Sequence, residues 1–390
     1  MGLAPEPLGL TPSQWEELVE EWGLPRYRGR QIFDALHRRG KRRYEEVREL
    51  PKDLSERLAR ELPVRLPEVA RREAARDGSV KYGLRLSDGA LIEAVFMPGE
   101  GDRASVNEFE DARAVSDFGC RISDLKAPTP RIEKFTVCLS SQTGCAVDCA
   151  FCVTGRLGGG RNLSAGEIVG QLDAVLDDLG RTVDGLRIVF MGMGEPFLNP
   201  DGVLGALEVL FELLSPRRVT VSTSGITPAF ARFAALPRRP NLAVSINAAD
   251  AETRSRLMPI NRTYPLPGLV RAMRDWPLEP HRRITAEYVL IEAVNDSPED
   301  AKRLARLLKG VPVKINVIPL NEDPEYLPGW RRPPEEAIDR FAGALAGSGA
   351  TVTVRRSKGP DARAACGQLK GRTEDTRRRG GAPLSSARPV

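Results

Sequence analysis

The chain has 390 residues, of which 41% are hydrophobic and 28% are charged, and its formal net charge is +5. These values exclude a membrane-embedded or a largely disordered protein, and they fit one large folded core with an accessory domain. No apolar run reaches the length of about 18 residues that a membrane helix needs. The N-terminus also lacks the basic and apolar regions of a signal peptide, so we expect a cytoplasmic protein.

The first third of the chain predicts helices followed by a hairpin. Apolar residues recur at helical spacing in "TPSQWEELVEEW", "GRQIFDALHRR" and "KDLSERLARELP", which predicts a helical accessory domain over residues 1–65. Between residues 79 and 98 apolar and polar residues alternate around "SDGA", and Asp-Gly is typical of a tight β-turn. Residues 66–132 are therefore expected to form a β-hairpin and an insertion or linker.

From residue 133 onward, apolar strand candidates alternate with amphipathic helices, which indicates parallel βα units. The strand candidates are "KFTVCLSS", "GLRIVFMG", "RRVTVSTSG", "NLAVSINA", "RITAEYVLI", "VKINVIPL" and "TVTVRRS". The predicted fold class is α/β, with a partial (β/α)6 TIM-like barrel over residues 133–369 whose site lies at the carboxyl ends of its strands. Residues 370–390 are expected to be a disordered basic tail.

Four of the six cysteines lie within the segment "CLSSQTGCAVDCAFC". Cys145, Cys149 and Cys152 form a Cys-x3-Cys-x2-Cys run, which can hold an iron-sulfur cluster and leave one iron without a protein ligand. The alternative is a structural zinc site with Cys138 as its fourth ligand, although the paired Cys-x2-Cys knuckles usual for zinc are missing. The two histidines, His37 and His281, are each flanked by arginine and are expected to be solvated.

A cysteine run of this spacing after the first strand of a βα barrel resembles the radical S-adenosylmethionine enzymes. Further motifs, among them "MGMGEPFLN", "RRVTVSTSG", "KINVIPLN" and "RRSKGPDARAACGQL", resemble the RlmN and Cfr family of RNA adenine methyltransferases over nearly all of residues 11–370. The resemblance implies a radical S-adenosylmethionine barrel, a 4Fe-4S cluster held by Cys145, Cys149 and Cys152, and S-adenosylmethionine as the second cofactor. It also implies an external one-electron donor.

The resemblance also implies three catalytic residues. Cys366 would carry a methyl group to carbon 2 of an adenosine through a transient protein–RNA adduct. Glu93 would remove the ring proton, and Cys138 would attack Cys366 to release the product with formation of a disulfide bond. Cys120 has no counterpart in the family and is interpreted as incidental.

The resemblance assigns the cofactor pocket to residues at the ends of strands. These residues are Gly194, Glu195, Ser222, Ser245, Ile246, Asn247 and Asn321. Because glycine has no side chain, the glycines of the "GMGEP" motif would allow a ligand to approach the backbone closely. The family's "SLHA" reads "SINA" here, so that Asn247 replaces a histidine; asparagine can form hydrogen bonds but cannot titrate.

The expected substrates are 23S rRNA and tRNA, and four basic runs, including "HRRGKRR" at residues 37–43, are compatible with RNA binding. A second departure from the family is the link between the Glu93 hairpin and the Cys138 strand, which is usually short and here has about 30 residues. We expect this insertion to affect the choice of substrate more than the chemistry. Two alternatives remain open: methylation of carbon 8, as in Cfr, and a non-catalytic metal-containing RNA-binding protein. With no heptad seam, we expect a monomer.

Overall fold

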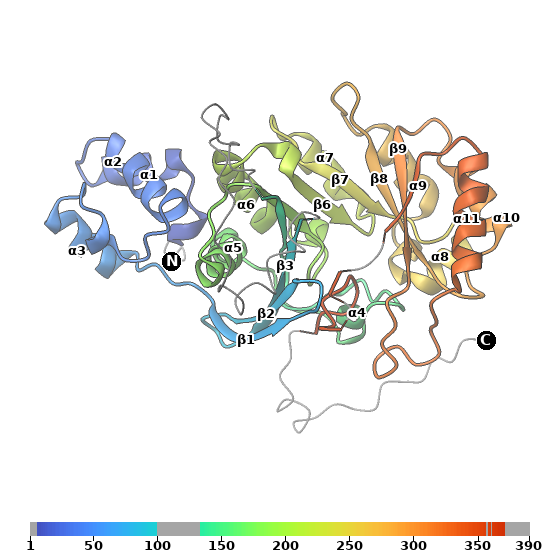
Figure 1. Ribbon diagram of the computed structural model, residues 1–390. Helices are drawn as coiled ribbons and strands as arrows, with labels where there is room; N and C mark the ends of the chain where they lie inside the picture. Colours follow the sequence, from blue (N-terminus) through green and yellow to red (C-terminus); the bar gives the residue numbers. More distant parts are fainter. Residues whose placement is uncertain (1–5, 100–132, 356–357, 360, 371–390) are drawn as a thin grey trace, which may run out of the picture.

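The computed structural model describes residues 6–99, 133–355, 358–359 and 361–370 (Figure 1). Ten strands of the described residues form one sheet in which spatial order follows chain order. The strands are β1 (Glu68–Ala74), β2 (Val80–Arg85), β3 (Leu91–Pro98), β4 (Phe135–Cys138), β5 (Leu186–Phe190), β6 (Val219–Thr223), β7 (Asn241–Ser245), β8 (Ile284–Leu290), β9 (Val313–Pro319) and β10 (Val352–Val354). Cys120, most of the insertion at 99–132 and nearly all of the tail at 370–390 lie outside the described residues.

Strands β4 to β10 are parallel, and each is joined to the next through helices, which gives six βα units and a short last strand. The helices are α4 (Val153–Arg156), α5 (Ala165–Leu179), α6 (Pro200–Leu213), α7 (Phe230–Ala234), α8 (Ala251–Leu257), α9 (Leu266–Arg274), α10 (Pro298–Leu307) and α11 (Glu335–Gly347). Short 3-10 turns are η5 (Pro196–Leu198), η6 (Pro216–Arg218), η7 (Thr227–Ala229) and η8 (Pro259–Arg262). The predicted partial (β/α)6 barrel is confirmed.

Helix α5 shows how the local sequence sets these elements. It begins at a capping box in which Ser164 and Glu167 satisfy each other's backbone N–H groups. It ends at Gly180, whose left-handed conformation (φ +58°) suits glycine. Its apolar face, which includes Ile168 and Leu172, is fully buried.

Strands β1, β2 and β3 extend the barrel sheet in antiparallel pairing, with β3 hydrogen-bonded to β4. The hairpin of β2 and β3 confirms the prediction from the Asp-Gly turn. Strand β1 was not expected, because its sequence "EVARREA" is charged and does not alternate between apolar and polar residues. It is an exposed edge strand, and charged side chains are typical of such edges.

The N-terminal segment folds into helices that pack on one side of the barrel (Figure 1). They are η1 (Pro7–Gly9), α1 (Pro12–Glu21), α2 (Tyr27–Phe33), the π-helical turn η2 (Asp34–Arg38), η3 (Tyr44–Glu46) and α3 (Lys52–Glu61). Helix α1 begins at Thr11, which forms a capping box with Gln14. Trp15, Phe33 and Leu58 are fully buried and belong to the same core cluster as the barrel.

The expectation that His37 is solvated is wrong, because its side chain is buried where η2 packs on α5. Its Nδ1 lies 3.6 Å from the carboxylate of Asp173, a residue that is also buried. Arg42 approaches the other Asp173 oxygen at 3.4 Å and forms two hydrogen bonds with Asp177, at 2.7 and 2.8 Å. The basic run at 37–43 therefore fastens the N-terminal helices to the barrel. His281 is exposed, as expected.

None of the helices among the described residues is both long and apolar enough to span a bilayer.

Replacement of Asp173 by asparagine is expected to lower the free energy of unfolding by about 2 kcal/mol, because it removes a buried carboxylate that the half-buried cation Arg42 contacts, although Arg42 keeps its bonds to Asp177. Urea unfolding of the purified chain measures this change. The matched control is Asp34→Asn, which removes a much less buried carboxylate from Arg30 and Arg38 and should cost less than about 1 kcal/mol. Equal losses in the two variants would contradict the role assigned to Asp173.

Candidate functional site

A cavity of about 160 Å³ lies at the carboxyl ends of the barrel strands. Ten of the residues expected at the site line it: Cys145, Cys149, Cys152, Gly194, Glu195, Ser222, Ser245, Asn247, Asn321 and Cys366. They come from segments that are up to 221 positions apart in the sequence, from Cys145 to Cys366. Parallel strands bring them together because their carboxyl ends meet at one edge.

The three cysteines of the Cys-x3-Cys-x2-Cys run occupy the loop between β4 and α4. Cys152 is the residue before the first turn of α4, and the backbone N–H groups of Thr154 and Gly155 are directed toward its sulfur. Burial raises the pKa of Cys145 to about 12, and burial also raises that of Cys149. All five cysteines among the described residues are free thiols.

These thiols form a suitable donor set for an iron-sulfur cluster, although no three His, Cys, Asp or Glu side chains of the described residues are arranged as a preformed metal site. Three features support the fit. The donors are soft sulfurs, they face one cavity, and each is close enough to another for their charges to interact. Backbone N–H groups beside cysteine sulfurs are also a known means of tuning such clusters.

Glu195 and the glycine before it form a second wall of the cavity. The Glu195 carboxylate is buried, and it accepts backbone hydrogen bonds from Ser224 at 2.7 Å and Phe197 at 2.9 Å. Burial raises the pKa of Glu195, whereas these N–H groups lower it. Gly194 has φ +97°, and a Cβ there would lie 2.6 Å from the side chain of Gln142, so only glycine fits this close approach.

The ends of β6 and β7 supply Ser222, Ser245 and Asn247 to the cavity. Asn247 adopts φ +57° and is held by its own hydrogen bonds: Oδ1 accepts from the N–H of Val289 at 2.8 Å. Asparagine tolerates this left-handed conformation better than most residues, which is a structural role for the residue that replaces the family histidine. Ile246 differs from the other expected residues, because its side chain is fully buried in the core and does not line the cavity.

The Cys366 loop lies over the cysteine run. Asn321 Nδ2 donates to the Cys366 carbonyl at 3.0 Å. On the α4 side, the N–H of Val153 donates to Gly367 O at 2.7 Å, and Thr154 Oγ1 donates to Leu369 O at 2.6 Å. The segment that carries Cys366 is thus bonded directly to the helix that follows Cys152.

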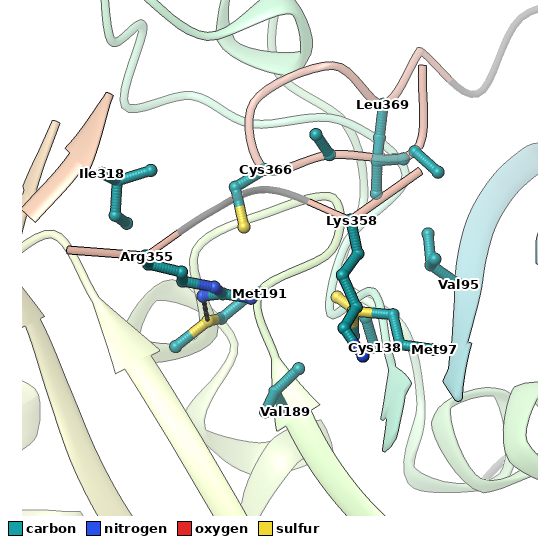
Figure 2. A pocket seen from close by; sticks show the side chains of 12 residues that line it. Val95, Met97, Cys138, Val189, Met191, Ile318, Arg355, Lys358, Cys366 and Leu369 are labelled. Atoms are coloured by element: carbon teal, nitrogen blue, oxygen red, sulfur yellow. Dashed lines mark hydrogen bonds between the residues drawn. The ribbon is translucent and has the colours of Figure 1, made fainter. Parts of the chain in front are cut away.

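Cys366 and Cys138, 228 positions apart, line one small cavity of about 20 Å³ beside the larger one (Figure 2). Cys138 is the last residue of β4, where its backbone pairs with Val95 on one side and Val189 on the other. Burial raises the pKa of Cys138 to about 12, and the nearby Cys366 adds to this effect. Arg355 acts in the opposite direction.

Arg355, which follows β10, was not predicted as a site residue. It lines both cavities, and its guanidinium contacts the sulfur of Met191 at 3.9 Å (Figure 2). Attraction to Cys366, and then to Glu287 and Cys138, raises the pKa of Arg355 against the effect of burial. A lone arginine after a short strand gives no motif, and only the fold places its charge beside both sulfurs.

Glu93 lies on β3, on the same face as Val95 and Met97 of the small cavity. The residue is 4% exposed, and its carboxylate accepts a hydrogen bond from the N–H of Lys370 at 2.9 Å and lies 3.8 Å from Lys81 Nζ. Lys81 is itself buried and pairs with Glu73 at 3.1 Å. Burial raises the pKa of Glu93, Lys81 lowers it and Glu73 raises it further.

Arg254 is another residue that sequence reasoning missed. It is fully buried and donates to the carbonyls of Ser224 at 2.8 Å and Ile246 at 3.1 Å, which terminate neighbouring strands. Burial lowers its pKa to about 10. The arginine therefore fixes the strand ends that carry the polar residues of the cavity. Its position in "AETRSRL" resembles that of any surface arginine on a short helix.

Comparison with known proteins agrees with this geometry. The profile of the Radical SAM superfamily matches residues 139–308. The dual-specificity RNA methyltransferase RlmN of Anaeromyxobacter dehalogenans is 40% identical over 98% of this chain and 96% of its own length. The probable dual-specificity RNA methyltransferase RlmN of Koribacter versatilis is 42% identical over 91% of this chain and 99% of its own length.

Among solved structures, that of a radical SAM methyltransferase from Sphaerobacter thermophilus is 39% identical, with a TM-score of 0.80 over 94% of this chain and all of its own. Membership of the radical SAM superfamily implies a 4Fe-4S cluster and S-adenosylmethionine as cofactors. The chain belongs to the RlmN family and is a radical S-adenosylmethionine RNA methyltransferase.

Proposed function

We propose that the protein methylates carbon 2 of an adenosine in 23S rRNA and in tRNA, through a methyl group carried on Cys366. The observation that carries the methyl-transfer chemistry is the meeting of Cys366 and Cys138 in one cavity, beside the three-cysteine loop. The choice of carbon 2 and of the two RNAs is supported by the similarity to dual-specificity RlmN methyltransferases. A structural zinc site would give no reason for two further thiols to converge there. A non-catalytic RNA-binding protein would likewise have no use for the pair.

The three thiols of Cys145, Cys149 and Cys152 would hold the cluster and leave one iron open. When bound, such a cluster would pass an electron from an external donor to S-adenosylmethionine, which would be cleaved to a 5′-deoxyadenosyl radical. Glu195, together with the strand-end side chains, would hold the cofactor's polar groups, since its buried carboxylate can accept from an ammonium group.

The remaining steps belong to the side chains around the small cavity. One S-adenosylmethionine would first methylate the Cys366 sulfur. The 5′-deoxyadenosyl radical from a second would take a hydrogen atom from this S-methyl group, and the resulting methylene radical bonds to the electrophilic adenine carbon. The radical adduct then loses one electron, which the oxidised cluster would take back, and its ring proton, which Glu93 accepts. The Cys138 thiolate attacks the Cys366 sulfur, the bond from that sulfur to the methylene carbon breaks, and this carbon takes up a proton to give the methylated base and a Cys138–Cys366 disulfide. Arg355 favours this attack, because it lowers the pKa that burial raises at Cys138.

The target base must leave its stack to reach a cavity at the strand ends, which favours loops over duplex RNA. We further propose that the N-terminal helices at residues 1–65 position the RNA, that the barrel domain over 133–369 acts as a monomer, and that residues 66–132 link the two. Mass spectrometry of nucleosides distinguishes the expected 2-methyladenosine from the 8-methyl product of Cfr-like chemistry.

Replacement of Cys138 by alanine should trap a covalent protein–RNA adduct, because no thiol then attacks Cys366. Denaturing gels with labelled RNA detect the adduct as a slow band. Cys366→Ala should give neither adduct nor methylated nucleoside, and Cys120→Ala should behave as the parent chain. If Cys366→Ala still methylated RNA in the purified system, the carrier role proposed for that cysteine would be wrong.

The acid limb of the methylation rate should lie above the ordinary glutamate pKa of 4.5, because burial raises the pKa of Glu93 and a base must be deprotonated to act. Rates as a function of pH, in single turnovers, measure this limb. Glu73→Gln should move the limb to lower pH, since it removes a neighbouring negative charge, and Lys81→Met should move it to higher pH.

Glu93→Gln should slow methylation at least about 100-fold while Cys366 still acquires its methyl group, which peptide mass spectrometry can verify. If the acid limb stayed at the same pH in both Glu73→Gln and Lys81→Met, Glu93 would be ruled out as the titrating base.

A further inference from the structure

A groove lined by cations lies at the end of the barrel opposite the cofactor cavity. Its volume is about 770 Å³, and its basic side chains are Arg283, Lys302, Arg306 and Lys309. We call this feature the basic groove. It runs along the C-terminal half of α10 and the turns before β8, β9 and β10, so it lies at the amino ends of strands whose carboxyl ends face the cavity. Figure 1 shows α10, whose residues line part of the groove, next to α11 on one side of the barrel.

The cations of the basic groove are exposed, and no acidic partner faces them within the part of the chain that the structure describes. No aspartate or glutamate is among the residues that line the groove, and none of its four cations forms an ion pair with another of the described residues. Arg283 is oriented by a neutral partner, since it donates to Thr351 Oγ1 at 2.7 Å. Cations in the last turn of a helix are common, but Lys302 precedes that turn and Arg283 belongs to another element.

The most basic run of the sequence, at 37–43, offers a contrast. Its cations are already neutralised by carboxylates of the same chain: Arg38 by Asp34, Arg39 by Glu49, Lys41 by Glu46, Arg42 by Asp173 and Asp177, and Arg43 by Glu45. Charge in the sequence is therefore a poor guide to the charge available to a ligand. The basic groove has no carboxylate of its own to displace when it meets a polyanion.

We propose that the basic groove binds the phosphodiester backbone of the RNA substrate, as a second contact remote from the methylation site. This inference rests on the proposed function, which supplies the RNA. Four converging unpaired cations attract phosphates and release the counterions of the RNA, which makes binding depend on salt. Because the groove and the cavity lie at opposite ends of the strands, a long folded RNA can contact both, whereas a short hairpin seated at the cavity cannot.

The test compares the double variant Arg306→Gln, Lys309→Gln with the matched double variant Arg232→Gln, Arg238→Gln. The control removes the same charge from exposed arginines that are paired with Asp201 and Glu212. Each protein is titrated with full-length tRNA and with a short hairpin of the same target loop, by fluorescence anisotropy at several salt concentrations. Methylation of both RNAs is measured in parallel.

For full-length tRNA, the groove variant should lower the slope of log affinity against log salt by about 1.5, because two phosphate contacts are lost. Its KM for tRNA should rise while kcat and hairpin binding stay unchanged, and the control should match the parent chain. The inference would be overturned if the groove and control variants gave the same slope of log affinity against log salt for tRNA. It would also be overturned if the groove variant lost as much affinity for the hairpin as for tRNA. Failure of the parent chain to methylate either RNA would refute the proposed function instead.

Discussion

The site depends on the hydrogen bonds that hold the Cys366 loop against the ends of the strands. Asn321 bonds the Cys366 carbonyl, and the N–H of Val153 bonds Gly367, directly after the cluster loop. On the other side, the N–H of Lys370 bonds the Glu93 carboxylate. The loop therefore bridges the cysteine run and the antiparallel strands. Without these contacts Cys366 would share a cavity with neither Cys138 nor the thiols expected to hold the cluster.

The second constraint is the cost of burying charged side chains near the site, and buried side chains such as Lys81 and Arg254 have a partner of opposite charge or a backbone carbonyl. Lys81 lies between Glu73 and Glu93, and Arg254 binds the strand-end carbonyls. An unpaired charge in such surroundings would be costly, so each group fixes the position of its partner. The same charges tune the chemistry. Lys81 offsets part of the burial effect on Glu93, and Arg355 offsets part of that on Cys138.

Sequence patterns predicted correctly those helices, turns and strands whose formation depends on residues close together in the chain. Capping residues such as Ser164, the Asp-Gly turn and the alternation of strands and helices all gave correct elements. Strand β1 was missed because its pairing with β2 is decided by the sheet and not by its own pattern. The cysteine run and the motifs named ten of the residues that line the cavity, whereas Arg355, Arg254 and the buried state of His37 arise from tertiary packing alone.

The most direct test of the central claim is anaerobic reconstitution of the full chain with iron and sulfide, followed by metal analysis and electron paramagnetic resonance with and without S-adenosylmethionine. The account predicts about four irons per chain and a signal that the cofactor perturbs, since one iron has no protein ligand. Cys149→Ala should lose both. Bound zinc, or an iron signal indifferent to S-adenosylmethionine, would contradict the open-iron site.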